Sequence, residues 1–353
     1  MVVPPKLADL GERKIVERLQ SRYEDRRHHI GDDCAVVYEN SGSFVLATTD
    51  PAPKPVCAEF GFDDLYYWGW LLAAINLSDL NAAGATPAGF LSSLTLPSDL
   101  PLTKFDRLLD GIDQACRAVG TQVIGGNLKE DPTGRITCEG TALGVSEGQP
   151  LGRRGAAPGD VMLALGNTGY FWSALELVRR GLPCDEELLA HFLTPAPLSP
   201  IGQLVREGGY STVAADASDG LYAAVASLTV SNGLGAELVV ESWHLPEIVL
   251  FTARRLRIDA WRLALGFGDL QFVTAVSADK VPRVEQVAKG RGLHVVNLGV
   301  VTEGPGITAL WKGKSSKMAN FDNERFTTTS QFTQGVAKYS DMLLSKPLFD
   351  CGD

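Results

Sequence analysis

The chain has 353 residues, a formal net charge of -10, and hydrophobic side chains at 45% of its positions. This length and composition predict two domains of ordinary size, each able to bury a core. Lysine and arginine form no cluster larger than pairs such as Arg153-Arg154, and together with the acidic balance this argues against nucleic acid or an anionic membrane surface as a partner.

Targeting and redox signals are sparse. The opening residues, MVVPPKLADLGERK, lack the long apolar run of a signal peptide. The longest charge-poor stretch, 66–98, is interrupted by Asp79, Gly84 and Pro87, which favours a buried helix, a turn and a strand over a membrane span. Six cysteines are scattered without a CxxC pair, so reduced thiols are expected. The chain is predicted to be cytoplasmic, with no membrane partner.

Strands and helices alternate along the first half of the chain. Helical periodicity covers 7–23, 62–83 and 102–119, and β-type apolar runs cover 44–49, 88–96, 121–124 and 136–145. The strand over 44–49 should end with Thr48, Thr49 and Asp50, because Pro51 follows. The helix over 62–83 is almost uncharged and stops at Gly84, so it should be buried on several sides.

A Gly/Pro/Arg-rich connector, 146–159, marks a candidate domain boundary. Beyond it, strands are predicted over 160–166, 213–215, 236–240, 271–276, 294–301 and 307–311, and helices over 170–180, 221–230, 248–265 and 281–290. The predicted fold class is therefore mixed α/β (α+β) in two domains, 1–150 and 151–320, followed by a C-terminal extension, 321–353.

Isolated carboxylates recur at the ends of apolar segments or inside them. The set comprises Asp33 in GDDCAVV, Asp50 after VLATT, Asp79 in the buried helix, and Asp216 and Asp219 in DASDGL. Burying a lone carboxylate costs on the order of several kcal/mol, so Asp79 should meet a cation, a metal or a set of donors. The alternative is a helix acid on a local solvent face or hydrogen-bonded near Asn76 or Ser78. Such a set suits a Mg²⁺ and polyphosphate site. The neighbouring Asp32 is expected to be a turn or capping residue.

The strand over 121–124 runs into Gly125-Gly126-Asn127. Two glycines let backbone amides approach a ligand closely, as phosphate-binding loops do. A bare hairpin turn explains the same glycine pair, and an asparagine in a turn needs no ligand. The residues alone leave both interpretations open.

Seven segments occur in one order, namely GDDCAVV, ATTD, NLSDLNAAGATP, IGGN, GRRGAAPGD, LALGNTG and DASDGL. They resemble thiamine-monophosphate kinase and, more distantly, the aminoimidazole ribonucleotide synthetase (PurM-like) superfamily, from about residue 11 to about residue 312. Several ordered motifs form a strong signal where any one alone is weak. The resemblance implies an N-terminal sheet that pairs across a homodimer, a C-terminal α+β domain, and ATP bound with several Mg²⁺ ions near their junction.

The resemblance also assigns roles position by position. It implies Mg²⁺ ligands at Asp33, Thr48, Thr49, Asp50, Asp79, Asp216 and Asp219, with Asp33, Asp50, Asp79 and Asp219 as the catalytic set. It implies nucleotide contacts at Gly125, Gly126, Asn127, Arg153 and Ser218, with Arg153 on a phosphate. These roles agree with the chemistry, because Mg²⁺ prefers carboxylate and hydroxyl oxygens and phosphoryl transfer needs charge neutralisation more than a protein nucleophile.

Departures from the kinase pattern concentrate on the acceptor side. Asn127 stands where the kinase has Asp, the substrate-contacting His is replaced near Cys57, and the substrate-binding Glu aligns with Gly268 in GFGDLQ. Losing a polar contact in a site built for it usually costs selectivity strongly. Cys57, Gly268 and Asp269 are candidate acceptor contacts, although Cys57 also suits a small buried hydrophobe and Asp269 a surface charge.

The expected function is Mg²⁺-dependent transfer of the γ-phosphoryl group of ATP to a small acceptor other than thiamine monophosphate, by a homodimeric enzyme. One alternative keeps the ATP site but activates an amide or carbamoyl oxygen, as a synthetase or dehydratase does. Release of inorganic phosphate without a stable phosphorylated product would favour it. A second alternative is a weakened ATP-binding protein, which would bind ATP tightly without converting it to ADP.

Overall fold

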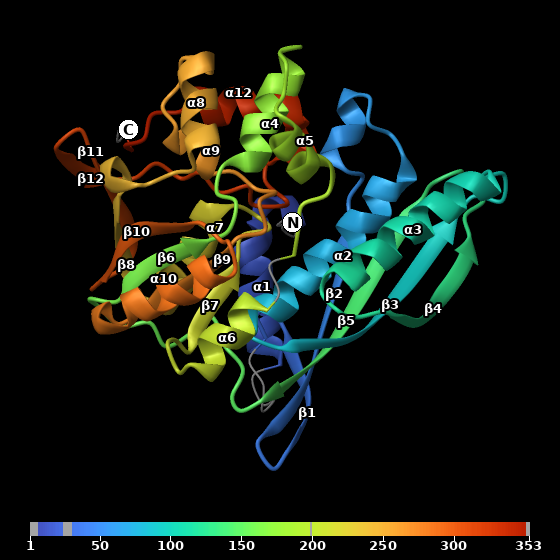
Figure 1. Ribbon diagram of the computed structural model, residues 1–353, viewed down its shortest axis with the longest axis horizontal. Helices are drawn as coiled ribbons and strands as arrows, with labels where there is room; N and C mark the ends of the chain where they lie inside the picture. Colours follow the sequence, from blue (N-terminus) through green and yellow to red (C-terminus); the bar gives the residue numbers. More distant parts are fainter. Residues whose placement is uncertain (1–5, 24–29, 198–199, 351–353) are drawn as a thin grey trace, which may run out of the picture.

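The computed structural model describes residues 6–23, 30–197 and 200–350, and its two sheets lie side by side (Figure 1). The first sheet is built from residues 35–147 and the second from residues 161–317. Both sheets carry helices, so the mixed α/β fold class predicted from the sequence is confirmed. Among the described residues, no helix combines the length and apolarity needed to cross a bilayer.

The first sheet has the strand order β1-β2-β5-β3-β4. Its strands are β1 (Ala35–Asn40), β2 (Ser43–Ala52), β3 (Thr86–Leu96), β4 (Val123–Glu130) and β5 (Thr137–Glu147). Helices α2 (Leu65–Ala82) and α3 (Leu102–Ala118) pack together on this sheet. They approach closely because each contributes a glycine at the crossing: a Cβ on Gly69 would lie 2.0 Å from the Leu108 carbonyl oxygen, and one on Gly111 2.0 Å from that of Tyr66.

The second sheet has the order β12-β11-β8-β10-β6-β9-β7. Its strands are β6 (Val161–Leu165), β7 (Val213–Asp216), β8 (Gly235–Val239), β9 (Phe272–Val276), β10 (Val295–Thr302), β11 (Gly306–Trp311) and β12 (Lys314–Lys317). Alternate residues of β6 enter different cores, as the two faces of a strand require: Met162 and Ala164 join one, Leu163 and Leu165 the other.

Helices cover both faces of the second sheet. Helices α6 and α10 share the smaller core, and α4, α7, α8 and α9 share the larger one. Their bounds are α4 (Tyr170–Arg179), α5 (Glu186–Leu193), α6 (Ile201–Glu207), α7 (Leu221–Leu228), α8 (Glu247–Leu256), α9 (Trp261–Ala264), α10 (Val281–Gly290), α11 (Gln331–Gln334) and α12 (Val336–Ser345). Such burial on both faces explains why β6, VMLAL, is apolar throughout.

Two expected strand ends are wrong. Strand β2 continues through Pro51 to Ala52, paired with β5. Beyond Ala47 it has no partner in β1, so this part of β2 is an edge, where a missing N–H is tolerated. Strand β4 likewise continues through Gly125 and Gly126, so the glycine pair forms neither a loop nor a hairpin turn.

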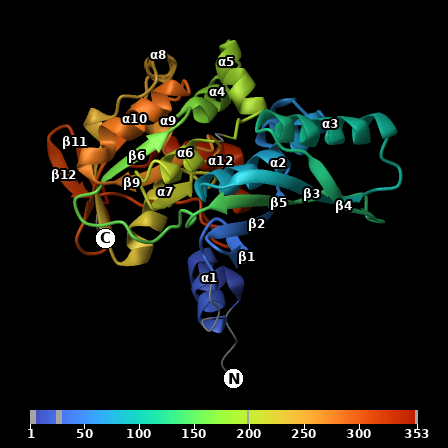
Figure 2. The same cartoon turned by 60° about the horizontal axis from the view of Figure 1, so that its bottom comes forward.

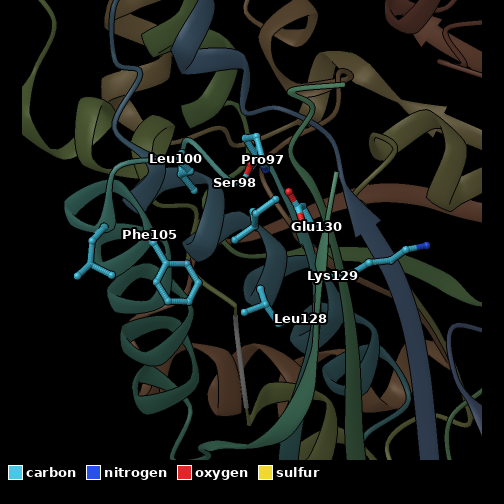
Figure 3. A pocket seen from close by; sticks show the side chains of 9 residues that line it. Pro97, Ser98, Leu100, Phe105, Leu128, Lys129 and Glu130 are labelled. Atoms are coloured by element: carbon cyan, nitrogen blue, oxygen red, sulfur yellow. The ribbon is translucent and has the colours of Figure 1, made fainter. Parts of the chain in front are cut away.

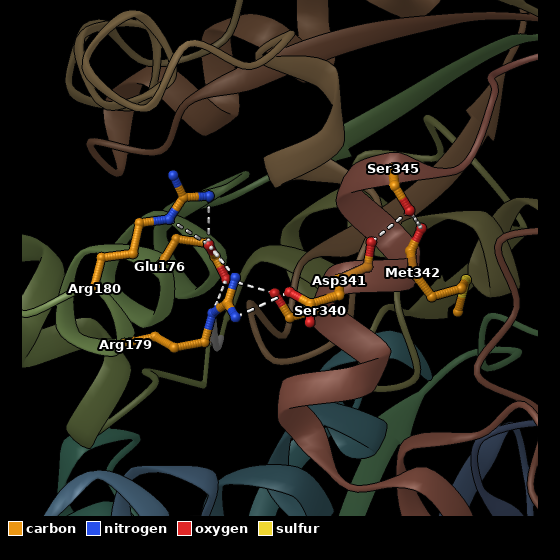
Figure 4. A network of polar contacts seen from close by, with 7 residues as sticks. All are labelled: Glu176, Arg179, Arg180, Ser340, Asp341, Met342 and Ser345. Carbon is orange, nitrogen blue, oxygen red and sulfur yellow. Dashed lines mark hydrogen bonds and ion pairs between the residues drawn. The ribbon is translucent and has the colours of Figure 1, made fainter.

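The two ends of the described chain meet. Helix α1 (Gly11–Arg22) lies at the junction of the two halves, below the first sheet in Figure 2. The backbone N–H of Glu12 donates to the carbonyl oxygen of Arg325 at 3.2 Å. The C-terminal segment is in turn held to α4, because the buried Glu176 accepts from Ser340 of α12 at 2.5 Å and pairs with Arg179 (Figure 4). The last part of the chain is thus packed against the second half.

All five cysteines in the described part of the chain carry free thiols, as expected, and Cys351 lies outside it. Four of the five are buried. Burial raises the pKa of the Cys57, Cys116 and Cys138 thiols to about 12, because an apolar surrounding disfavours the thiolate. These cysteines are packing residues.

Candidate active site

Three carboxylates predicted from the sequence converge where the two sheets meet. Asp33 precedes β1, Asp79 lies in the last turns of α2, and Asp216 ends β7. One oxygen from each lies within 4.8 Å of the others, the spacing of ligands around a single cation. Asp79 and Asp216 are each 7% exposed, so the solvent-face alternative for Asp79 is wrong.

The electrostatics of this cluster call for a cation. Desolvation first, and then the charges of Asp216 and Asp33, raise the pKa of Asp79 well above its usual value. Burial, followed by the charge of Asp33, raises the pKa of Asp216 to about 7. Buried like charges are tolerated when a metal or protons neutralise them. The three oxygens and the repulsion between them therefore fit a divalent cation such as Mg²⁺.

Strand alternation separates the two threonines of β2. The hydroxyl of Thr48 donates to Asp79 at 2.7 Å, so Thr48 lies with the carboxylates. Thr49 is exposed on the opposite face, where its hydroxyl donates to the Gly140 carbonyl oxygen at 2.8 Å. The expected ligand role is thus supported by position for the side chain of Thr48 and not for that of Thr49.

Asp50 borders the cluster and is clamped through its backbone. The side chain of Asn76 accepts from the Asp50 N–H at 2.9 Å and donates to its carbonyl oxygen at 3.2 Å. Burial raises the pKa of the Asp50 carboxyl to about 6, although the Arg325 guanidinium opposes the shift. Asn76 fixes where Asp50 points, a contribution that sequence reasoning missed because an asparagine in an apolar helix has many uses.

The adjacent residues Asp32 and Asp33 contact different groups of Arg153. Asp32 accepts from the backbone N–H of Arg153 at 2.8 Å, in keeping with the capping role expected for it. Asp33 accepts from the Arg153 guanidinium at 2.5 Å, and this pairing holds the pKa of the arginine above its usual value. Arg153 carries the positive charge paired with Asp33 and borders a polar cavity, a suitable position for a phosphate contact.

Two cavities adjoin this centre, and Asp219 lines both. The larger, about 340 Å³, is polar and is bordered by Arg153, Arg154 and residues of α1. The smaller, about 100 Å³, is mainly apolar and is bordered by Asp50, Ser218 and several aromatic side chains. Ser218 also donates to Asp216 at 3.1 Å. Asp219 thus stands between the two cavities and outside the three-carboxylate group.

Of the three predicted acceptor contacts, Gly268 alone lines the apolar cavity. Its φ is +104°, and a Cβ there would lie 2.6 Å from the ring of Phe171, so this position excludes a side chain. Cys57 is 2% exposed and belongs to the larger core, as the small-hydrophobe alternative expected. Its predicted contact with the acceptor is therefore wrong.

Asp269 is fully buried, so neither the acceptor contact nor the surface charge expected for it is correct. Its carboxylate accepts from the backbone N–H groups of Gly169 and Phe171, at 2.6 and 2.7 Å, at the N-terminus of α4. The His191 ring lies 3.1 Å away. Asp269 therefore satisfies otherwise unpaired helix donors and stabilises the fold beside the cavity.

The Gly125-Gly126-Asn127 segment lies far from the carboxylates of its own chain. Asp50 pairs with Gly140 on β5, Gly140 pairs with Ser92 on β3, and Ser92 pairs with Gly126 on β4. Three strand spacings of about 4.8 Å therefore separate Asp50 from Gly126, roughly 14 Å in all. Every residue of β4 is exposed.

Both halves of the chain match known family models. Residues 31–146 match the AIR synthase related protein, N-terminal domain, and residues 157–312 match the AIR synthase related protein, C-terminal domain. The chain belongs to the AIR synthase related family. Within it, this protein is a thiamine-monophosphate kinase-like, ATP-dependent kinase.

Named relatives and solved structures support this subfamily. Thiamine-monophosphate kinase of Methanopyrus kandleri is 31% identical over 287 residues, which cover 80% of this chain and 86% of the relative. That of Synechococcus elongatus is 29% identical, with coverage of 91% and 98%. A solved structure of AaThiL complexed with AMPPCP and TMP has a TM-score of 0.78 at 26% identity, covering 92% of this chain and all of that one. The two-domain PurM-like fold predicted from the motifs is thus confirmed.

Proposed function

We propose that this protein transfers the γ-phosphoryl group of ATP, with Mg²⁺, to a small acceptor other than thiamine monophosphate. The observation that carries the proposal is the convergence of Asp33, Asp79 and Asp216 between an arginine-bordered polar cavity and an apolar cavity. In-line phosphoryl transfer needs such an arrangement, with cations between donor and acceptor. The name of the relatives and the AMPPCP in one of their structures support the ATP assignment.

The residues divide into three functional groups. Asp33, Asp79 and Asp216 would hold Mg²⁺, with Thr48, Asp50 and Asp219 at the border of the cluster and the backbone of Thr49 beside them. The ion would supply positive charge to neutralise the phosphates and the charge that develops during transfer. Arg153 and Ser218 contact the phosphate chain, and the aromatic cavity orients the acceptor for attack. Catalysis in this scheme is positioning and charge neutralisation by Asp33, Asp50, Asp79 and Asp219.

The proposal of a different acceptor rests on Gly268. The kinase resemblance aligns a substrate-binding Glu with this position, and here the Phe171 ring occupies the space that any side chain would need. A site with an aromatic ring in place of a carboxylate favours a different acceptor group. A polar substrate group left without its partner costs about 10-fold or more in selectivity.

Nucleotide-dependent stabilisation tests the kinase assignment. Mg²⁺ with AMPPCP should raise the unfolding temperature of the wild-type protein, and Asp50→Asn should reduce that rise. The exposed Asp99→Asn makes the same side-chain change away from the site and should leave the rise intact. Absence of any rise in the wild-type protein would rule the proposal out. Release of inorganic phosphate without a phosphorylated product would instead support the alternative function, activation of an amide or carbamoyl oxygen.

We also propose a homodimer in which β4 is the contact strand. Strand β4 carries apolar side chains at Ile124 and Leu128, which are 50% and 65% exposed, on an open sheet edge. Figure 3 shows the hollow beside it, about 480 Å³, where Phe105 and Leu128 face one another. A second copy of the sheet would cover this surface. Gly125, Gly126 and Asn127 would then serve the nucleotide of the other copy, which accounts for their distance from the carboxylates of their own chain.

A further inference from the structure

The apolar cavity has the lining of a pocket for a flat ring. Its aromatic wall is formed by Tyr67, Phe171, Phe192, Phe267 and Phe332. Its volume of about 100 Å³ is below the roughly 150 Å³ of an engineered cavity that binds benzene, so the enclosed part takes only part of a ring and the rest of the ligand lies at the open mouth. Aromatic walls favour stacking and edge contacts with such a ring.

The charged residues of the cavity lie around its edge. Asp50 and Asp219 are the only carboxylates among the described residues that line it, and both stand at the metal end. Gly268 cannot be replaced by a carboxylate, since Phe171 fills that space. The remaining charged residues in the lining are cations, Lys54 and Arg325. The cavity therefore provides no carboxylate away from the metal end to pair with a cationic ring, and two cations to pair with an anion.

Arg325 has hydrogen-bonding capacity to offer a ligand. Its guanidinium is 3.6 Å from Asp219 and 3.8 Å from Glu12, both beyond ordinary hydrogen-bond length. It lies 5.4 Å from the centre of the Phe332 ring, which faces the same cavity. Its side chain is 41% exposed. Within the described chain no side-chain hydrogen bond uses its five N–H donors, so they can bind an anionic group bidentately.

The two chain ends hold Arg325 in place. Besides the backbone bond between Glu12 and Arg325, the N–H of Arg13 donates to Glu324 at 3.0 Å, and the Arg13 side chain pairs with Asp322. All of these residues lie outside the ranges 31–146 and 157–312 that match the family models. Arg325 is thus added to the cavity by segments outside the shared two-domain core.

We propose that the acceptor joins one uncharged flat ring to an anionic group, and that Arg325 binds the anionic group while the ring occupies the aromatic cavity. This rests on the proposed function, because it names the substrate class of the same site. Arg325 is the specificity-determining residue in this assignment. Glu12 competes with the anion for its guanidinium, which lies over the Phe332 ring.

Titration calorimetry in the presence of Mg²⁺ and AMPPCP tests the proposal with benzyl phosphate as the probe and phenylacetate as a carboxylate form. Benzyl alcohol and benzyltrimethylammonium keep the ring without the anion, and thiamine monophosphate supplies two linked rings with a cation. Benzyl phosphate should bind at least about 10-fold more tightly than either ring control and more tightly than thiamine monophosphate. Equal or weaker binding would overturn the proposed substrate class.

Three variants test the role of Arg325. Arg325→Gln should weaken benzyl phosphate binding about 10- to 100-fold, and Glu12→Gln should strengthen it, because it removes a competing carboxylate. Arg254→Gln removes a guanidinium of similar pairing, 67% exposed and 3.9 Å from Glu247, and should change nothing. Unchanged binding in Arg325→Gln, or weaker binding in Glu12→Gln, would refute the assignment.

The same experiment separates this proposal from the proposed function. If wild-type protein fails to bind Mg²⁺ with AMPPCP, the kinase proposal fails and the acceptor class fails with it. If it binds the nucleotide but prefers thiamine monophosphate to benzyl phosphate, the kinase proposal stands and the acceptor class alone is wrong.

Discussion

The buried carboxylate of Asp216 makes the stability of the protein depend on pH and on Mg²⁺ in a way that Asp216→Asn should remove. Its side chain accepts from Ser78 at 2.9 Å and from Ser218 at 3.1 Å, and an amide can keep both contacts with these hydroxyls. The substitution is close to isosteric. Its main effect is to delete a charge from the cluster.

The magnitude follows from the raised pKa. Burial raises the pKa of Asp216 from 3.8 to about 7, which corresponds to about 4 kcal/mol at 1.36 kcal/mol per pH unit. Because the folded-state pKa is the higher one, the stabilisation is complete below the unfolded pKa and is lost as pH rises through about 7. Between pH 5.5 and 8 the remaining loss is about 2 kcal/mol. As pH rises from 5.5 to 8, the free energy of unfolding of Asp216→Asn should increase by about 2 kcal/mol relative to that of the wild-type protein.

Urea unfolding at pH 5.5 and pH 8, in EDTA and separately in Mg²⁺ without EDTA, measures this effect. Wild-type protein should be less stable at pH 8 without Mg²⁺ and should gain more from Mg²⁺ at pH 8, since the metal needs ionised ligands. Asp216→Asn should lose the Mg²⁺ response, and the exposed Asp99→Asn should behave as wild type. A stability difference between Asp216→Asn and wild type that is constant with pH would refute the reasoning.

Three further substitutions probe the cavity, the helix cap and the dimer. Gly268→Ala should lower the free energy of unfolding by about 1–3 kcal/mol, because the new methyl group clashes with Phe171. Stabilisation by Mg²⁺ and AMPPCP should remain intact. An unchanged midpoint in urea titration would contradict the expected clash. Asp269→Asn should lower the free energy of unfolding by about 1.5–3 kcal/mol, because one side-chain oxygen no longer accepts from the N-terminus of α4. Normal stability combined with lost acceptor binding would show instead that Asp269 is a substrate contact. Leu128→Glu should yield monomers in sedimentation velocity, and unchanged dimers would place the contact elsewhere.

Local patterns were sufficient for much of the fold. Periodicity placed α2, α3 and most of the apolar strands within a few residues, because burial selects the side chains on each face; β4 extends further than expected, to Glu130. Helices α5, α6, α11 and α12 and strands β1 and β12 were not predicted, and the single helix predicted over 248–265 is two helices, α8 and α9. Some of these elements are short, and β1 is largely exposed, so its apolar pattern is weak.

For the site, the sequence by itself determined the chemistry, and the tertiary structure decided the geometry. Ordered motifs predicted Asp33, Asp79 and Asp216 as oxygen ligands, and the structure brings one oxygen of each within 4.8 Å of the others. No local pattern could bring Arg325 to Asp219, since that contact joins the C-terminal segment to the loop after β7, and Arg325 is also held by Glu12 from the other end of the chain. A local pattern also could not predict that the Asp269 side chain is buried, because its carboxylate accepts from backbone amides at the start of a helix 100 residues earlier. Contacts between distant segments are set by packing, and packing is a property of the folded chain.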